Sequence, residues 1–283
     1  MSLVADAADF PDHLRPDEVL QIVDFMAGCD PIIVGGQSVN IWARYYAARD
    51  PSLEDLGPFT SKDVDFFRNR QAAQQLAARL ESGTVLLPTP TDMGTPNAAV
   101  VLGELNGRRV VVDFMASVLG VDDDSITDNF VAIEGRWNGA TINLLVMHPL
   151  DCVRSRLANI NTLRRFDDHS VRQAALSLRV LEHYLGDVLA AGNFRSAQRI
   201  LKDLQFVVRD QHLGRPSHRR FGAELNILDL IERFVSHPGL DQRWRELVLQ
   251  RAVERLRSKA GEEHAQPDDP DVALADGSAS TRP

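Results

Sequence analysis

Two aspartates separated by one residue, Asp63 and Asp65, are the side chains in this sequence whose type and spacing most directly suggest chemistry. They stand in residues 60–67 (TSKDVDFF), whose apolar end predicts a strand. Side chains at positions i and i+2 of a strand point to the same face, so the two carboxylates should converge. Carboxylates repel one another unless a cation lies between them, and Mg²⁺ prefers such oxygen ligands. The alternative is a pair of solvated aspartates at the mouth of a strand.

A third aspartate, Asp113, lies inside the apolar run 110–115 (VVVDFM). This run is the second arm of a predicted hairpin, because Asn106-Gly107 joins residues 98–105 to 108–115 with a pair typical of tight hairpin turns. An unpaired charge buried there would cost several kcal/mol and needs compensation. Strand alternation leaves a second interpretation open, with Asp113 on a solvated face beside Arg109 and Val111. If the strand that carries Asp113 lies next to the strand of Asp63 and Asp65, the third carboxylate would complete a two-metal site for phosphoryl or nucleotidyl transfer.

A glycine turn, Gly35-Gly36-Gln37-Ser38, separates a predicted buried strand at 31–34 from a predicted helix at 39–46. Glycines let the backbone approach a triphosphate, a helix N-terminus offers free N–H groups, and the Ser38 hydroxyl adds a donor. A Gly-Gly pair alone indicates only a turn. The pair becomes a more specific indication of a nucleotide site because the Asp63/Asp65 strand and the hairpin with Asp113 follow it in the sequence.

In this order of motifs the sequence resembles the DNA polymerase β-like nucleotidyltransferase superfamily. The run Val34-Gly35-Gly36 together with residues 61–67 is most similar to the AbiEii/AbiGii nucleotidyltransferase toxins of bacterial toxin–antitoxin and abortive-infection systems. The resemblance implies an NTP substrate, two Mg²⁺ ions and a helical C-terminal region. It places the metal ligands and catalytic acids at Asp63, Asp65 and Asp113, and nucleotide contacts at Gly35, Gly36, Gln37, Ser38 and Lys62.

The chain departs from that family in two places. The interval from Gly36 to Asp63 is longer than expected, which points to an inserted loop at residues 50–58, a segment rich in Pro, Gly and acid. The family's later lysine and arginine motifs are replaced by arginines alone, which also hold phosphate well. At about 100° per residue, Arg154 and Arg165 share a helix face while Arg156 points elsewhere, so Arg154 is the predicted phosphate contact.

Composition indicates a globular protein of the cytoplasm. The 283-residue chain is 44% hydrophobic, and its acidic first residues do not look like a signal peptide. No apolar run reaches the roughly 18 residues of a membrane span, so no membrane partner is expected. Cys29 and Cys152 lie far apart without metal-ligand spacing, which fits a reducing compartment. His148 likewise lacks a nearby partner ligand and is interpreted as structural.

Charge divides the chain unevenly. Residues 1–150 carry 10 Lys/Arg and 21 Asp/Glu, residues 151–260 carry 20 and 13, and residues 261–283 carry 1 and 6. Such a division suits carboxylates that bind metal in the first half and arginines that bind phosphate in the second. On charge alone, however, arginines on solvated helix faces are the favoured interpretation. Residues 215–220 are predicted to form a basic loop, with contact to RNA as the alternative to simple solvation.

The predicted fold is α+β. A nucleotidyltransferase domain at 1–148, with a mixed sheet and flanking helices, precedes a helical domain at 149–260 and a disordered acidic tail at 261–283. Further helices are predicted at 17–27, 71–80, 171–189, 194–208, 223–234 and 241–256, a further strand at 141–147, and a helix cap at 167–169.

The predicted function is transfer of an NMP from an NTP to an RNA acceptor, such as a tRNA 3′ end, or to a protein. The enzyme would be the toxin of a system with a cognate antitoxin. Two alternatives stay open: a catalytically inactive binding or regulatory protein on the same fold, and an enzyme that modifies a small molecule such as an antibiotic.

Overall fold

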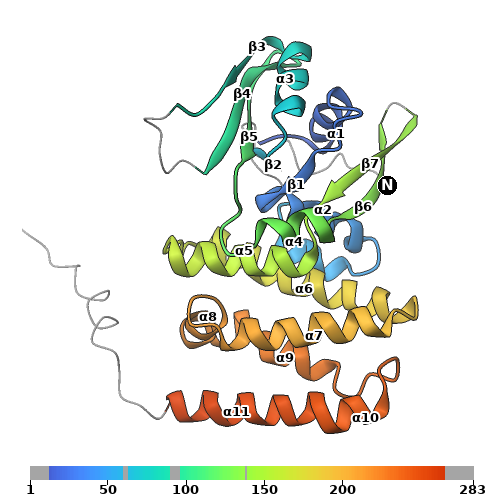
Figure 1. The fold of residues 1–283 in the computed structure, drawn as a ribbon, viewed down its shortest axis with the longest axis vertical. Coiled ribbons are helices and arrows are strands. Elements are labelled where there is room, and N and C mark those ends of the chain that lie inside the picture. Colours follow the sequence, from blue (N-terminus) through green and yellow to red (C-terminus); the bar gives the residue numbers. More distant parts are fainter. Residues whose placement is uncertain (1–12, 60–62, 90–95, 138, 265–283) are drawn as a thin grey trace, which may run out of the picture.

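The fold combines one mixed sheet with many helices, as the α+β prediction requires (Figure 1). The computed structural model describes residues 13–59, 63–89, 96–137 and 139–264. The strands are β1 (Ile32–Val34), β2 (Val64–Phe67), β3 (Glu81–Leu86), β4 (Asn97–Leu105), β5 (Arg108–Met115), β6 (Val131–Trp137) and β7 (Ala140–Val146). Helices around the sheet are α1 (Pro16–Phe25), α2 (Gly35–Ala47), η1 (Pro51–Leu56), α3 (Arg70–Arg79) and α4 (Asp123–Asn129).

The C-terminal part is helical throughout the described residues. Its elements are α5 (Pro149–Thr162), α6 (Asp168–Ala190), α7 (Phe194–Arg209), α8 (Gly214–Phe221), η2 (Gly222–Leu225), α9 (Ile227–Arg233), α10 (Gln242–Trp244), η3 (Arg245–Leu249) and α11 (Gln250–His264). In Figure 1 these helices form layers below the sheet, with α5 and α6 nearest to it and α11 farthest.

The seven strands lie in the order β3-β4-β5-β2-β1-β7-β6. Parallel pairs join β2 to β5 and β1 to β7, whereas the remaining neighbours are antiparallel. The β4–β5 hairpin turns at Asn106 and Gly107, both with positive φ, which confirms the predicted turn. The sheet centre therefore brings β1, β2 and β5 together, and these are the strands that carry the predicted site residues.

An aromatic pair fixes the register between β2 and β5. Phe66 and Phe114 are opposed in the ladder, fully buried, and stacked with ring centroids 5.5 Å apart. Because side chains alternate along a strand, a slip of one strand by one residue would turn its ring to the opposite face and away from its partner. Burial of this pair on one face thus forces Asp65 and Asp113 together onto the other.

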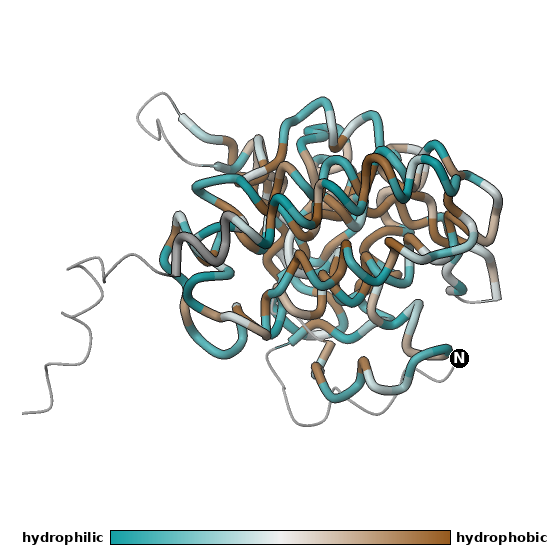
Figure 2. The backbone as a smooth tube through the Cα atoms, turned by 90° about the horizontal axis from the view of Figure 1, so that it is seen from below, coloured by the Kyte–Doolittle hydropathy of each residue, from teal (hydrophilic) through white to brown (hydrophobic). Residues whose placement is uncertain are grey.

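Two hydrophobic clusters meet at α5 and α6. The cluster under the sheet includes Cys152 of α5 and Leu176 and Val180 of α6, while the helical cluster takes Val153 and Leu181 from the same two helices. Seen from below in Figure 2, hydrophobic and hydrophilic stretches alternate along the helices, as expected where one face of each is buried. The boundary predicted at 148/149 remains a prediction, and the two parts share these helices.

Most predicted elements appear within a few residues of their expected ends. The prediction of a loop over 50–58 is wrong in part, because Pro51–Leu56 form a 3-10 helix that buries Leu53 and is held by Asp50, which accepts from Arg179 and His183. The predicted basic loop at 215–220 is instead the helix α8. Strands β3 and β6 and helix α4 were not predicted.

The C-terminal end also differs from expectation. Helix α11 continues to His264, so residues 261–264, predicted to belong to the disordered tail, are helical; residues 265–283 lie outside the described part. Among the described helices, none is long and apolar enough to cross a membrane.

Candidate active site

Asp65 and Asp113 stand side by side at the centre of the sheet. They are direct Cα partners in the parallel β2–β5 pair, so their side chains lie on one face. That face is open toward the sheet edge, since Val111, two residues before Asp113, is 39% exposed. Both interpretations of Asp113 hold in part: it alternates with exposed positions, yet it is partly buried next to a second acid.

The surroundings of Asp65 and Asp113 disfavour the charged form of both carboxyl groups. Burial raises the pKa of Asp65 to about 6, with the charges of Asp113 and Asp63 adding to the rise and that of Arg156 opposing it. Burial and the charge of Asp63 also raise the pKa of Asp113. Asn97 limits that rise, because its Nδ2 donates to Asp113 Oδ1 over 3.0 Å.

Asp63 lies just before β2 and is exposed. Its charge acts on both other carboxyl groups, so the three acids share one electrostatic environment. Within the described residues, however, no three His, Cys, Asp or Glu side chains are close enough together to hold a metal ion. The donor chemistry suits a hard cation at the Asp65–Asp113 pair, whereas the predicted closed set of three ligands is not formed.

The glycine turn packs directly against the acidic pair. Val34 is the antiparallel partner of Asp65, so Gly35, at the first position of α2, lies against the Asp65 side chain. Gly35 has a φ of 67°, and a Cβ added there would collide with Asp65 Oδ2. Only glycine combines this left-handed backbone with so close an approach. The structure thus brings the acids and the N-terminus of α2 together.

Arg156 of α5 is a basic residue whose side chain lies near both Gly36 and Asp65. Its Nη1 lies 3.6 Å from the Cβ position of Gly36, and its charge lowers the pKa of Asp65. The Arg156 Nε atom is buried without a hydrogen-bond partner among the described residues, and burial lowers the pKa of its guanidinium. A buried and incompletely bonded guanidinium beside a helix N-terminus offers a site for an anion.

The structure brings Arg156, rather than the predicted Arg154, next to the glycine turn and Asp65. Arg154 points to the opposite side of α5, where its Nη1 donates to the buried Asp151 over 2.9 Å. It lines a separate cavity of about 380 Å³ with His148 and Arg199. His148 has the structural role expected, since its Nδ1 accepts from Leu150 N at the start of α5. Helix α5 ends at Thr162, so Arg165 does not continue the face assumed for Arg154.

Two predicted nucleotide contacts face inward. The fully buried Ser38 donates its hydroxyl to Gly35 O over 2.7 Å and lies 3.3 Å from Cys152 Sγ. Gln37 is 7% exposed, and its Oε1 accepts from Asn40 Nδ2. Both side chains are therefore bonded within the turn, and contact of these two residues with a nucleotide stays a prediction. Lys62 lies outside the described residues.

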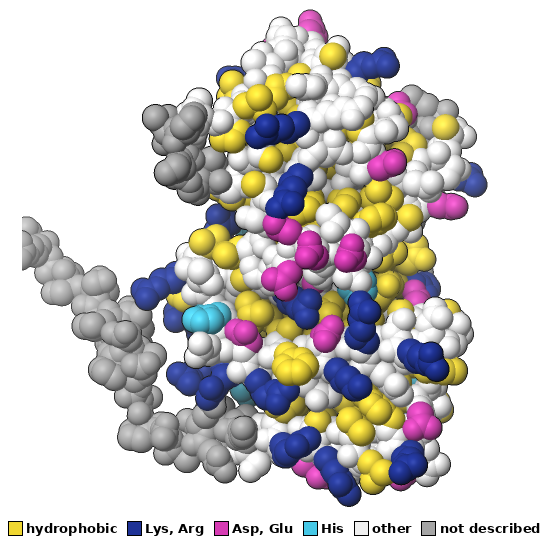
Figure 3. Space-filling model, viewed as in Figure 1, with side chains coloured by type: hydrophobic (Ala, Val, Ile, Leu, Met, Phe, Trp, Pro, Cys, Tyr) yellow, Lys and Arg dark blue, Asp and Glu magenta, His cyan; other side chains and the backbone are white. Residues whose placement is uncertain are grey.

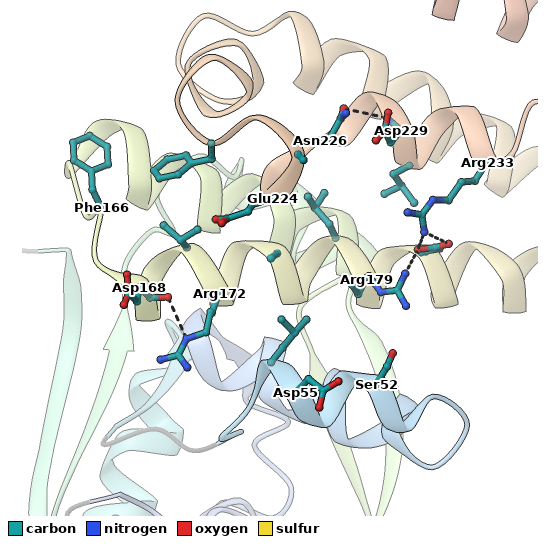
Figure 4. A pocket seen from close by; sticks show the side chains of 18 residues that line it. Ser52, Asp55, Phe166, Asp168, Arg172, Arg179, Glu224, Asn226, Asp229 and Arg233 are labelled. Carbon is teal, nitrogen blue, oxygen red and sulfur yellow. Dashed lines mark hydrogen bonds and ion pairs between the residues drawn. The ribbon is translucent and has the colours of Figure 1, made fainter. Parts of the chain in front are cut away.

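A larger cavity, of about 850 Å³, opens between η1, α6 and α9 (Figure 4). Arg172, Arg179 and Glu224 project into it, and Arg233 binds Glu182 at its edge. Its lining includes none of the predicted site residues. Volume alone would favour this cavity, but the acidic pair and the glycine turn lie elsewhere.

Comparison with known proteins does not assign the chain: no protein-family model matches it, and neither a curated protein nor a solved structure matches it significantly. The geometry of the site therefore carries the functional argument. Two carboxylates, a helix N-terminus and a buried guanidinium form a surface suited to a phosphate ester accompanied by a divalent cation.

Proposed function

We propose that this protein is a Mg²⁺-dependent nucleotidyltransferase, which transfers an NMP from an NTP to a hydroxyl acceptor and releases pyrophosphate. The observation that carries the proposal is the register of β2 on β5, which sets Asp65 beside Asp113 and against Gly35. The resemblance of Val34-Gly35-Gly36 and residues 61–67 to nucleotidyltransferases of the DNA polymerase β-like superfamily also supports it.

Asp65 and Asp113, with Asp63 at the edge, are the residues that would hold the cation. Bound Mg²⁺ would neutralise charge on the triphosphate and favour departure of pyrophosphate. The N–H groups of the first turn of α2 and the Arg156 guanidinium bind phosphate oxygens. The raised pKa of Asp113 suits its carboxylate to accept the proton of the attacking hydroxyl, whose oxygen forms the new bond to the α-phosphorus.

RNA is the acceptor that the charge distribution favours. Residues 151–260 carry 20 Lys/Arg against 13 Asp/Glu, and Figure 3 shows basic side chains spread over the helical part of one face. Exposed members on α7 and α8 include Arg195, Arg199, Lys202, Arg219 and Arg220. Such a surface attracts a polyanion. By the family resemblance, the acceptor is a tRNA 3′ end or a protein hydroxyl, of which the basic surface favours the tRNA. The protein would then act as a toxin held in check by an antitoxin.

One observation favours a second candidate function, nucleotide binding without transfer. The described carboxylates do not form a closed group of three metal ligands. A protein that retained the anion site at Gly36 and Arg156 but lacked a complete metal site would bind and regulate without catalysis.

The test follows label from each NTP, supplied with Mg²⁺ and total RNA, total protein or an aminoglycoside. Label in the α-phosphate should enter an acceptor, whereas label in the γ-phosphate should leave with pyrophosphate. The variants Asp65→Asn and Asp113→Asn should lose at least a hundredfold in rate, as expected when a metal-holding carboxylate is removed.

Asp124→Asn is the matched control, because Asp124 is an exposed acid whose carboxylate has no partner among the described residues. Nucleotide binding without incorporation into any acceptor would favour the non-catalytic function. Equal incorporation by Asp65→Asn and the unaltered protein would refute the proposed active site. Incorporation into the aminoglycoside alone would assign the acceptor to small molecules.

A further inference from the structure

A row of three buried amides leads from the interior to Gly36. Gln173 of α6 is 5% exposed, and its Nε2 donates to Asn40 Oδ1 over 2.9 Å. Asn40 Nδ2 in turn donates to Gln37 Oε1. Each amide fixes the orientation of the next, so the Gln173 oxygen is directed away from Asn40.

That oxygen has no hydrogen-bond partner among the described residues. It lies 3.9 Å from the place that a Cβ of residue 36 would occupy, and Arg156 Nη1 lies 3.6 Å from the same point. Buried polar atoms in proteins are nearly always hydrogen-bonded, and an exception calls for an explanation. Here a buried acceptor and a guanidinium with an unpartnered Nε flank one glycine at the start of a helix.

A ligand that satisfies both groups must combine an anion with a hydrogen donor. Phosphate diesters and the inner phosphates of a triphosphate carry no proton at neutral pH, so they bind Arg156 but offer nothing to Gln173 Oε1. In a nucleotide, the donors nearest to the phosphates are the ribose hydroxyls, because the base amino groups lie beyond the sugar.

We infer that Gln173 accepts a hydrogen bond from a ribose hydroxyl of the bound nucleotide and so selects the sugar. This inference rests on the proposed function, since it requires a nucleotide at Gly36. It makes Gln173 a specificity-determining residue and a nucleotide with intact ribose the substrate class. A site built around such a hydroxyl discriminates strongly against analogues that lack it.

The experiment measures dissociation constants by calorimetry on the full-length protein with Mg²⁺ and no acceptor. The probes are the four NTPs, the matching 2′-deoxy, 3′-deoxy and 2′,3′-dideoxy compounds, and inorganic tripolyphosphate. The unaltered protein should bind its preferred NTP about 10- to 100-fold more tightly than the dideoxy compound. Gln173→Met, which keeps the side-chain length but removes the acceptor, should bind both equally and leave tripolyphosphate binding unchanged.

Gln205→Met is the matched control, because Gln205 also holds a buried unpartnered amide atom among the described residues but lies on α7. It should keep full sugar discrimination. If Gln173→Met does not fold, the sugar series on the unaltered protein still tests the inference, because equal binding of the ribo- and dideoxynucleotides would overturn it.

Equal binding of ribo- and dideoxynucleotides by the unaltered protein would overturn the inference and leave the proposed function standing. Discrimination that survives in Gln173→Met would overturn it equally. Tripolyphosphate binding that weakens with Gln173→Met would show that the amide binds phosphate instead of sugar. Absence of binding by any nucleotide would overturn both the inference and the proposed function.

Discussion

Asp65 and Asp113 are opposed in neighbouring parallel strands, and the charge of Asp113 adds to the rise in the pKa of Asp65. The fold holds two carboxyl groups in a place where burial and mutual repulsion disfavour their charged forms. Ionisation of these groups therefore lowers the free energy of unfolding, and a bound cation would offset that loss. The first two predictions follow from this relationship.

Stability should fall as pH rises through the range in which Asp65 ionises. Its pKa in the folded protein is about 6, above the ordinary 3.8, so the unfolded chain releases this proton first. The free energy of unfolding, measured in urea without divalent cations, should fall by about 2 kcal/mol between pH 4 and 7 from this group. Asp65→Asn should remove that part of the pH dependence. An unchanged profile in the variant would contradict the assignment.

Mg²⁺ should offset the loss of stability that ionisation of Asp65 and Asp113 causes. At pH 7.5 the unaltered protein should gain several degrees in Tm with millimolar Mg²⁺, because the ion binds the folded state. Asp65→Asn and Asp113→Asn should raise the Tm of the metal-free protein and abolish the gain with Mg²⁺. Binding should weaken below about pH 6, where Asp65 holds a proton. Asp124→Asn should behave like the unaltered protein, and a full Mg²⁺ response in Asp65→Asn would refute the cation site.

Gly35→Ala should lower the free energy of unfolding by more than the strain of a positive φ alone would explain. The added methyl group would collide with Asp65 Oδ2 as well as strain the backbone. Gly107→Ala is the matched control, since Gly107 also has a positive φ, of 75°, but nothing within 4 Å of its Cβ position. We expect losses in unfolding free energy of roughly 2 to 4 kcal/mol at Gly35 and about 1 kcal/mol at Gly107. Equal losses would show that Asp65 moves aside freely.

The two arginines of α5 should respond in opposite ways to replacement by methionine. Arg156→Met should change the unfolding free energy by less than about 1 kcal/mol, because this guanidinium is poorly bonded, but should weaken nucleotide binding about 10- to 100-fold. Arg154→Met should cost about 2 to 3 kcal/mol by leaving the buried Asp151 without its cation, while binding stays unchanged. Chemical denaturation and calorimetry on both variants check this, and weaker binding in Arg154→Met would reverse our assignment.

Local patterns were sufficient to predict the strands that carry the acids. Alternation, the Asn-Gly turn and the glycine turn are properties of short segments, so β1, β2 and the β4–β5 hairpin were predicted close to their observed ends. Strand β3 was missed because residues 81–86 (ESGTVL) begin with polar residues and glycine, and their pairing with β4 determines the conformation.

The choice between Arg154 and Arg156 could not be made from the sequence. It depends on which face of α5 meets α2, and that is a tertiary contact. The apolar residues of α5 do not indicate which side of the helix faces α2, because the helix contributes buried residues to both hydrophobic clusters. It therefore has no single inward face. The inward turn of Ser38 similarly depends on the packing of Cys152 beneath it.

The sharing of α5 and α6 between the two clusters bears on how this protein can be divided. A fragment that stopped at residue 148 would keep all three aspartates and the glycine turn, yet it would lack Arg156, Gln173 and the buried surface that Cys152, Leu176 and Val180 provide. The smallest portion that contains every residue of the proposed site therefore extends through α6. Shuffling of the helical region between related chains would exchange part of the proposed nucleotide site along with it.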